Sequence, residues 1–314
     1  MGFLLNTYGA GNALRWAGGN RCNGQNLRKG TALRTALEAP DGFVIAVLDQ
    51  SNIEARVLAW LAQETQLLEG FRNKVDLYCQ FASTVYGRTI TKEDKTERFV
   101  GKTCQLGLGY QMGAARLRAT LALGAMGPAI FISHEEARKL VLIYRTKYKA
   151  ITNLWHEAAG VLQHMITMET GEIDWRGLKI RNSSIVLPNN MVLSYPQIKN
   201  SIDEDTGDSQ VVYNGRSYWV KIFPGKLVEN IIQALSRIIV ASNTLDAKEI
   251  LTDIDSEGQL ALLVHDEIVA VVEDDKAQKY LDKLTVVMRT PPAWCSKGNL
   301  TLDAEGGYAK SYTK

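Results

Sequence analysis

Two acidic residues end apolar, strand-like stretches of this 314-residue chain. Asp49 closes GFVIAVLDQS, and Asp266 lies in LLVHDEIVAVV, followed directly by Glu267. Because Asp and Glu are rarely buried unless something neutralises them, the second stretch predicts either an ordinary hairpin turn or a turn covered by a cation. Two strand-end aspartates brought together would suit a pair of Mg²⁺ ions, which stabilise the attacking and leaving oxygens of phosphoryl transfer. The sequence leaves open whether Asp49 and Asp266 meet.

A third stretch, TERFVGKTCQLGLGYQMGAARLR, carries residues at a spacing of four: Arg98, Lys102, Leu106 and Tyr110. This spacing predicts one stripe along a helix. Arg and Lys one turn apart can bind adjacent phosphates, and a tyrosine ring can stack on a base. The alternative is a solvated helix face. The glycines of the stretch, each costing about 1 kcal/mol relative to Ala in a helix, favour close approach to a bulky group.

The elements that must position these residues follow from hydrophobic spacing. The run that ends at Asp49 predicts a buried strand feeding a helical stretch, NIEARVLAWLAQETQLLEGFRN. Further helices are predicted from Lys92 to about Ala119 and from Ser133 to about residue 166, the latter with a capping box. Beyond about residue 170, hairpins around 189–190 and 214–215, a long amphipathic helix and a strand–turn–strand unit follow. This order predicts an α+β domain interrupted by a helical insertion.

Composition restricts the class of protein. The chain is 46% hydrophobic and 22% charged, as expected for a globular protein with a core. Its net charge of +2 indicates no overall basic field, so any nucleic-acid surface must be local. Four scattered cysteines without a CxxC pair indicate neither a zinc site nor a disulfide framework, and favour a reducing cytoplasm. No apolar run is long enough to predict a membrane span.

Five motifs follow one another along the chain: LRWAGGNRCNGQNL (14–27), DQSNIEAR (49–56), RFVGKTCQLGLGYQMG (98–113), ENIIQA (229–234) and VHDE (264–267). In this order they resemble the family-A DNA polymerases of the DNA polymerase I type, most closely the bacteriophage branch. The resemblance implies a right-hand polymerase core with an antiparallel palm sheet (1–62 and 188–314) and a helical fingers insertion (63–187). It also implies that thumb and exonuclease domains are absent from this chain.

The resemblance further implies two Mg²⁺ ions, held by Asp49, Asp266 and the backbone carbonyl of Gln50, with Glu267 supporting the site. Arg98 and Lys102 would bind the nucleotide phosphates, Lys102 being the candidate proton donor to the leaving group. Leu106 and Tyr110 would face the incoming nucleotide and the templating base, and Glu54 would be the steric gate against a ribose 2′-hydroxyl. The implied DNA contacts are Arg15, Asn23, Gln25, Asn26, Gln233 and His265.

Four positions depart from the family pattern: Leu106 for Phe or Tyr, Phe99 for a second arginine, Asn52 for glutamine and Arg28 for proline. None removes a metal ligand or a phosphate contact. One alternative is a catalytically silent, polymerase-like DNA-binding subunit, which would be expected to lack Asp49, Asp266 or Lys102. Another is a single-subunit RNA polymerase, which Glu54 and Glu267 disfavour.

The expected partners are primer-template DNA, dNTPs and a further part of the polymerase. That further part is expected to carry the thumb domain and a 3′–5′ exonuclease domain. That part would be a separate chain or a missing N-terminal segment, since the sequence is expected to be the C-terminal polymerase part of a divided or truncated phage polymerase. No membrane partner is expected. The expected location is the host cell cytoplasm.

Overall fold

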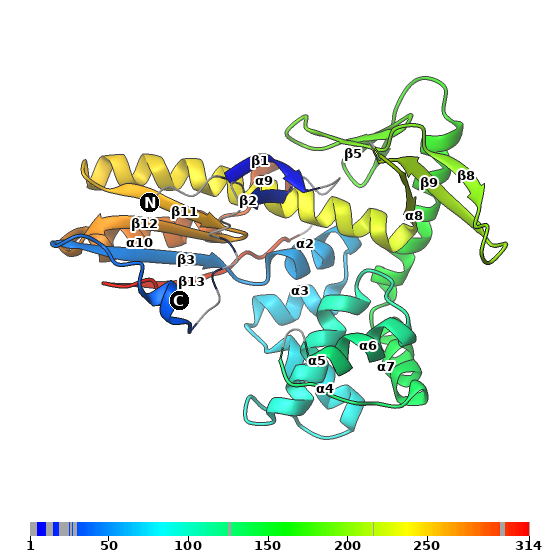
Figure 1. Ribbon diagram of the computed structural model, residues 1–314, viewed down its shortest axis with the longest axis horizontal. Helices are drawn as coiled ribbons and strands as arrows, with labels where there is room; N and C mark the ends of the chain where they lie inside the picture. Colours follow the sequence, from blue (N-terminus) through cyan, green and yellow to red (C-terminus); the bar gives the residue numbers. More distant parts are fainter. Residues whose placement is uncertain are drawn as a thin grey trace. The chain divides into compact units, whose positions relative to one another are not determined.

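The computed structural model describes residues 5–10, 15–18, 25, 27, 30–124, 127–215, 217–295 and 299–313. The chain divides into two compact units, one formed by 1–54 and 233–314 and the other by 55–232. Figure 1 labels many of the helices and strands of both units. The palm and fingers bounds expected at residues 62 and 188 describe functional subdomains and stay a prediction.

The first unit is built on a four-stranded antiparallel sheet in the order β11-β12-β3-β13. Its strands are β3 (Phe43–Gln50), β11 (Gln259–Val264), β12 (Glu267–Glu273) and β13 (Ala304–Ala309). The unit also contains the β1 (Leu5–Ala10) and β2 (Arg15–Gly18) pair, α1 (Ala32–Thr35), α10 (Ala277–Arg289), and η3 (Asp274–Lys276) and η4 (Ala293–Cys295). The long helix α9 (Pro224–Ile254) contributes its part from Gln233 onward.

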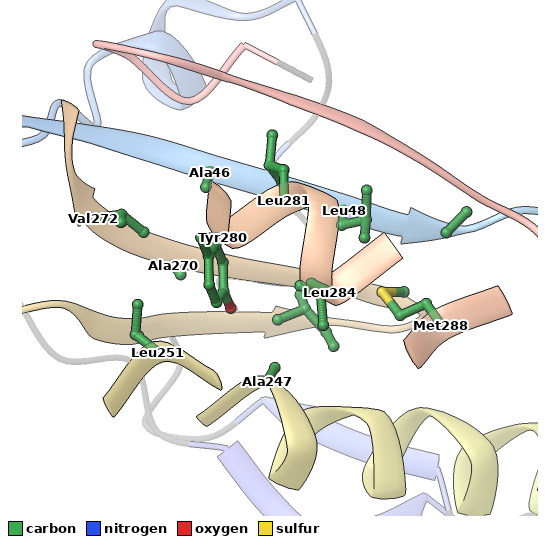
Figure 2. Packing of buried hydrophobic residues seen from close by; sticks show 12 residues of the cluster. Ala46, Leu48, Ala247, Leu251, Ala270, Val272, Tyr280, Leu281, Leu284 and Met288 are labelled. Carbon is green, nitrogen blue, oxygen red and sulfur yellow. The ribbon is translucent and has the colours of Figure 1, made fainter. Parts of the chain in front are cut away.

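The sheet of the first unit has a core on each face. On one face, Ala46 and Leu48 of β3 pack with residues of α9 and α10, including Leu251 and Leu284 (Figure 2). On the other face, Ile45, Val47 and Val269 pack with Ala39 and Tyr312. Because successive side chains of a strand alternate in direction, Asp49 continues the second face and Gln50 the first.

The described residues of the second unit include the first part of α9, up to Ile232, and seven further helices. These are α2 (Ile53–Ala62, which begins at the unit boundary), α3 (Thr65–Arg72), α4 (Leu77–Tyr86), α5 (Lys95–Leu108), α6 (Ala114–Leu123), α7 (His134–Lys147) and α8 (Lys149–Thr167). Its two antiparallel sheets are β4 (Ile173–Trp175), β5 (Leu178–Arg181), β6 (Ser184–Val186) and β7 (Val192–Ser194), and β8 (Lys199–Ile202), β9 (Ser209–Asn214) and β10 (Trp219–Ile222). The predicted α+β fold class is confirmed.

Several local predictions are confirmed. Ser133 and Glu136 form the capping box at the start of α7. The hairpins around 189–190 and 214–215 join β6 to β7 and β9 to β10. The strand–turn–strand prediction is also correct, because β11 and β12 are joined by the two residues His265 and Asp266.

The predicted lengths of three helical stretches were wrong. The stretch after Asp49 divides into α2 and α3 near Gln63, whose φ is +58°. The stretch from Lys92 to Ala119 divides into α5 and α6 between Gly109 and Gly113, where the Trp155 indole nitrogen donates to the Gly109 carbonyl at 3.0 Å. The third stretch divides at Tyr148 into α7 and α8. Within the part of the chain that the structure describes, no helix is long and apolar enough to cross a membrane.

Candidate active site

The sheet of the first unit brings Asp49 and Asp266 to neighbouring strand ends. Asp49 lies directly opposite Glu267 of β12, and the Gln50 backbone nitrogen donates to the Asp266 carbonyl at 2.9 Å. Both aspartates are half-buried. His265, the other turn residue, has a φ of +53°, a region in which His, Asn and Asp occur more often than other residues. The pairing of β3 with β12 therefore places the two aspartates at neighbouring strand ends of one sheet.

Gln50 fixes the end of β3. Its side chain is fully buried, and its amide nitrogen donates to the backbone carbonyls of Met288 at 2.7 Å and Asp303 at 3.1 Å. Its amide oxygen accepts from Asn243 at 2.9 Å. Since buried hydrogen-bonded networks hold one geometry when they are satisfied, the backbone next to Asp49 is held in place from the opposite face of the sheet.

The Glu267 carboxylate contacts two other side chains of the first unit. It is buried, lies 3.1 Å from an Arg34 guanidinium nitrogen and accepts a hydrogen bond from the Tyr312 hydroxyl. Burial, and then the neighbouring Glu267 carboxylate, raise the pKa of Tyr312 above its usual range, so the hydroxyl stays a donor. The cation facing this carboxylate is therefore a guanidinium. Sequence reasoning missed Arg34, whose only signal is a basic residue among small and apolar neighbours.

A small cavity of about 40 Å³ adjoins the turn. It is lined by residues predicted as the sugar gate, DNA contacts and a metal ligand, together with others that sequence reasoning missed: Gln25, Ile53, Glu54, Gln233, Ser236, Arg237, Val240, His265 and Asp266. Ser236 and Arg237 could have been found from the helical spacing of three and four residues after Gln233. The Ser236 hydroxyl is buried and has no hydrogen-bond partner among the described residues.

The remaining predicted DNA contacts lie in the N-terminal stretch. Gln25 is buried and donates to the Leu263 carbonyl at 3.3 Å. The backbone of Arg15 belongs to β2, but its side chain is not described. Asn23 and Asn26 lie outside the described residues. The structure therefore gathers Gln25, Gln233 and His265 around one cavity.

In the second unit, α5 carries Arg98 and Lys102 one turn apart. Two guanidinium nitrogens of Arg98 lie 2.9 Å from one carboxylate oxygen of Asp76, whose other oxygen caps α4 by accepting from the Tyr78 and Cys79 backbone at 3.1 Å. Burial opposes ionisation of Asp76, but the Cys79 amide and the guanidinium outweigh it and lower the pKa of this carboxyl. Sequence reasoning missed Asp76, although an Asp before an apolar helical run is an N-cap signal.

The predicted stripe is only partly helical. Leu106 lies in α5, but the helix ends at Leu108, and the Tyr110 backbone nitrogen donates to Gly107 at 3.3 Å in a turn. The close approach predicted from the glycines is to the protein itself. A Cβ at Gly101 would lie 2.2 Å from the Tyr78 carbonyl oxygen of α4, and one at Gly109 would lie 2.7 Å from Leu58.

Residues 21–181 match the model of the family described as DNA polymerase family A. The chain belongs to this family. It is 32% identical over 305 residues to the DNA polymerase of Bacillus phage SP02, covering 90% of this chain and 43% of that protein. It is 34% identical over 122 residues to the thermostable DNA polymerase I of Thermus thermophilus, covering 39% of this chain and 14% of that protein.

The fold agrees with a solved structure, the POL domain of Pol1 from M. smegmatis in complex with DNA primer-template and dNTP. The TM-score is 0.73 at 18% identity, over 99% of this chain and 48% of that one. The predicted polymerase core is thereby confirmed as the fold. The match to the phage polymerase covers most of this family-A chain but less than half of the length of that protein.

The structure gives reasons for two departures from the family pattern. Phe99, which replaces an arginine, is buried. Asn52 has a φ of +53°, where Asn is tolerated better than most residues. Leu106 is half-buried, and nothing in the structure explains its replacement of an aromatic residue. Arg28 lies outside the described residues.

Proposed function

We propose that this chain carries out template-directed DNA synthesis, adding dNTPs to a primer 3′-hydroxyl with release of pyrophosphate. The observation that supports the proposal most directly is the pairing of β3 with the β11–β12 turn. It sets Asp49 and Asp266 at adjoining strand ends, where the Gln50 backbone nitrogen donates to the Asp266 carbonyl at 2.9 Å. Membership of DNA polymerase family A supports the same activity.

The donor set suits the proposed Mg²⁺ ions. Within the described residues no group of three or more His, Cys, Asp and Glu side chains is arranged to hold a metal. Magnesium is commonly bound by one or two carboxylates, with waters and substrate phosphates completing the octahedron. Asp49, Asp266 and the Gln50 carbonyl would therefore hold two ions together with the substrate. When bound, the ions would lower the pKa of the primer hydroxyl and stabilise charge on the leaving pyrophosphate.

The other residues would orient the substrates. Glu54 would exclude a ribose 2′-hydroxyl. Arg15, Gln233 and His265 would contact the primer terminus and minor groove, and Gln25 would also contact DNA. Contacts with acceptors shared by all correct base pairs test shape rather than sequence. Arg15, Asn23 and Asn26 are proposed to contact DNA on the strength of the sequence motif alone.

On α5, Arg98 and Lys102 would bind the triphosphate, and Lys102 would donate a proton to the leaving pyrophosphate. Tyr110 would stack near the templating base. The supporting observation is that Arg98 is already oriented by Asp76, with two of its nitrogens on one carboxylate oxygen. We further propose that a separate chain or a further segment supplies a thumb and that synthesis takes place in the cytoplasm of a host cell.

The test is primer extension with the purified chain, Mg²⁺ and dNTPs, comparing wild type with Asp49→Asn and Asp266→Asn. Asp275→Asn is the matched control, since Asp275 is an exposed aspartate of the same unit. Loss of incorporation in the first two variants alone is expected. Near wild-type rates in either of them would reject the metal assignment. DNA binding without incorporation by the wild type would favour the silent subunit, and preference for rNTPs would favour an RNA polymerase.

A further inference from the structure

A buried cluster of three residues, Arg34, Glu267 and Tyr312, adjoins the two strand-end aspartates. We call it the Glu267 cluster. The Arg34 and Glu267 side chains are 3% and 5% exposed and lie 3.1 Å apart. The Tyr312 hydroxyl donates to the same carboxylate oxygen, Oε1, and the Arg34 guanidinium stacks on the Tyr312 ring at 3.7 Å from its centroid. Each member of the cluster thus contacts both others.

The position of Glu267 in the sheet makes a counter-charge necessary. Asp49 lies directly opposite Glu267 on one side and directly opposite Glu305 on the other, so the register sets three acidic residues in one row. Like charges directly opposite on neighbouring strands destabilise a sheet. A buried carboxylate also loses its hydration unless it is paired and hydrogen-bonded. Arg34 supplies both the opposite charge and a hydrogen bond.

The cluster also connects the strand end to two distant segments. A second Arg34 nitrogen donates to the Leu27 carbonyl at 3.1 Å. The backbone nitrogen of Tyr312 donates to the Leu37 carbonyl at 2.9 Å. Residues near both ends of the chain therefore converge on one carboxylate oxygen. A carboxylate held by two such donors has little freedom to turn toward Asp49 and Asp266.

We propose that Arg34 and Tyr312 are positioning residues that hold the Glu267 carboxylate charge-balanced and away from the metal ions, so that Asp49 and Asp266 are the carboxylates that bind them. This inference rests on the proposed function, because it concerns the same metal site. It gives Glu267 a defined part in supporting the site: it anchors the turn through Arg34 and does not bind metal itself.

The test measures binding of Mn²⁺, used as a spectroscopic substitute for Mg²⁺, to the full chain without DNA or nucleotide. Electron paramagnetic resonance reports the free ion. Arg34→Gln leaves Glu267 without its counter-charge, so Mn²⁺ is expected to bind at least about threefold more tightly. Glu267→Gln leaves Arg34 unbalanced, so Mn²⁺ is expected to bind at least about threefold more weakly.

The double variant decides between a balanced pair and a ligand. If Arg34 balances Glu267, Arg34→Gln with Glu267→Gln restores affinity to near the wild-type value, because the pair is again neutral. If Glu267 binds the metal, the double variant lacks a ligand and binds Mn²⁺ more weakly than wild type, and the proposal is overturned. Retained far-ultraviolet circular dichroism is required of each variant.

Tyr312→Phe keeps the test decisive if Arg34→Gln does not fold, because it removes one hydroxyl and keeps the stacked ring. Loss of the hydroxyl is expected to loosen Glu267 and so to tighten Mn²⁺ binding at least twofold. In a Glu267→Gln background, Tyr312→Phe should no longer change the affinity. If Tyr312→Phe alone leaves the Mn²⁺ affinity unchanged, the role of Tyr312 is overturned. Asp49→Asn separates the two proposals. If it fails to weaken Mn²⁺ binding, the metal site itself is wrong. If it weakens binding but the cluster variants leave the affinity unchanged, only the positioning role of Arg34 and Tyr312 is rejected.

Discussion

Gly101 allows α5 to lie close enough to α4 for Arg98 to reach Asp76. A Cβ built on Gly101 would lie 2.2 Å from the Tyr78 carbonyl oxygen and 3.1 Å from its carbon. Real Cβ atoms essentially never come closer than 3.0 Å, so Gly101→Ala must separate the two helices by about 0.8 Å. The atom in the way belongs to the backbone of α4 and cannot move aside as a side chain could.

The magnitude follows from two opposing effects. Alanine gains about 1 kcal/mol of helix propensity over glycine. Forcing extra volume into a packed contact costs about 1–3 kcal/mol, and a backbone clash lies at the upper end of that range. We therefore expect Gly101→Ala to lower the free energy of unfolding by about 2 kcal/mol.

Gly107→Ala is the matched control, because it is the same substitution in the same helix. Its Cβ would meet only the end of the flexible Met112 side chain, at 2.7 Å from Cε. Met adapts readily to such changes. The free energy of unfolding of this variant should therefore stay unchanged or rise by up to about 1 kcal/mol. Urea unfolding followed by circular dichroism measures both. If the free energies of unfolding of the two variants agree within about 0.5 kcal/mol, the contact between α4 and α5 does not require glycine and the reasoning is refuted.

Four further predictions concern the site. Glu54→Ala should raise rNTP relative to dNTP incorporation in primer extension; unchanged discrimination would move the gate elsewhere. Lys102→Ala should lower the rate at saturating dNTP as well as the affinity, because negative charge on the leaving pyrophosphate grows in the transition state; an intact saturating rate would leave Lys102 a binding role only. Without metal, Asp49→Asn should raise the melting temperature, because it removes a charge from the acidic row; a lower one would contradict that. The pKa of Asp76 lies below its ordinary value of 3.8, so the stability that this carboxylate contributes is present above that pH and is lost as the pH falls through the lowered value. In urea titrations, Asp76→Asn should therefore lose less stability than wild type between pH 5 and about pH 2. An equal loss in both proteins would show that the Arg98–Asp76 pair is not responsible.

Much of the site could be predicted from local sequence, because its signals lie within short stretches. The two strand-end aspartates, the α7 capping box and the His265–Asp266 turn depend on neighbours a few residues away. Helix ends were less predictable. The break after α5 depends on Trp155, 46 residues from the Gly109 carbonyl that it binds, and hydrophobic spacing carries no information about such a donor.

The sequence by itself determined which residues could bind metal and phosphate, since charge and side-chain chemistry belong to each residue wherever it lies. Only the tertiary structure decided which side chains surround Glu267. Glu267 receives its counter-charge from Arg34, 233 residues away, and its hydroxyl donor from Tyr312, 45 residues away. Such a pair forms only when the sheet register brings the strands together, because Coulomb attraction and hydrogen bonding act at contact distance and not along the chain.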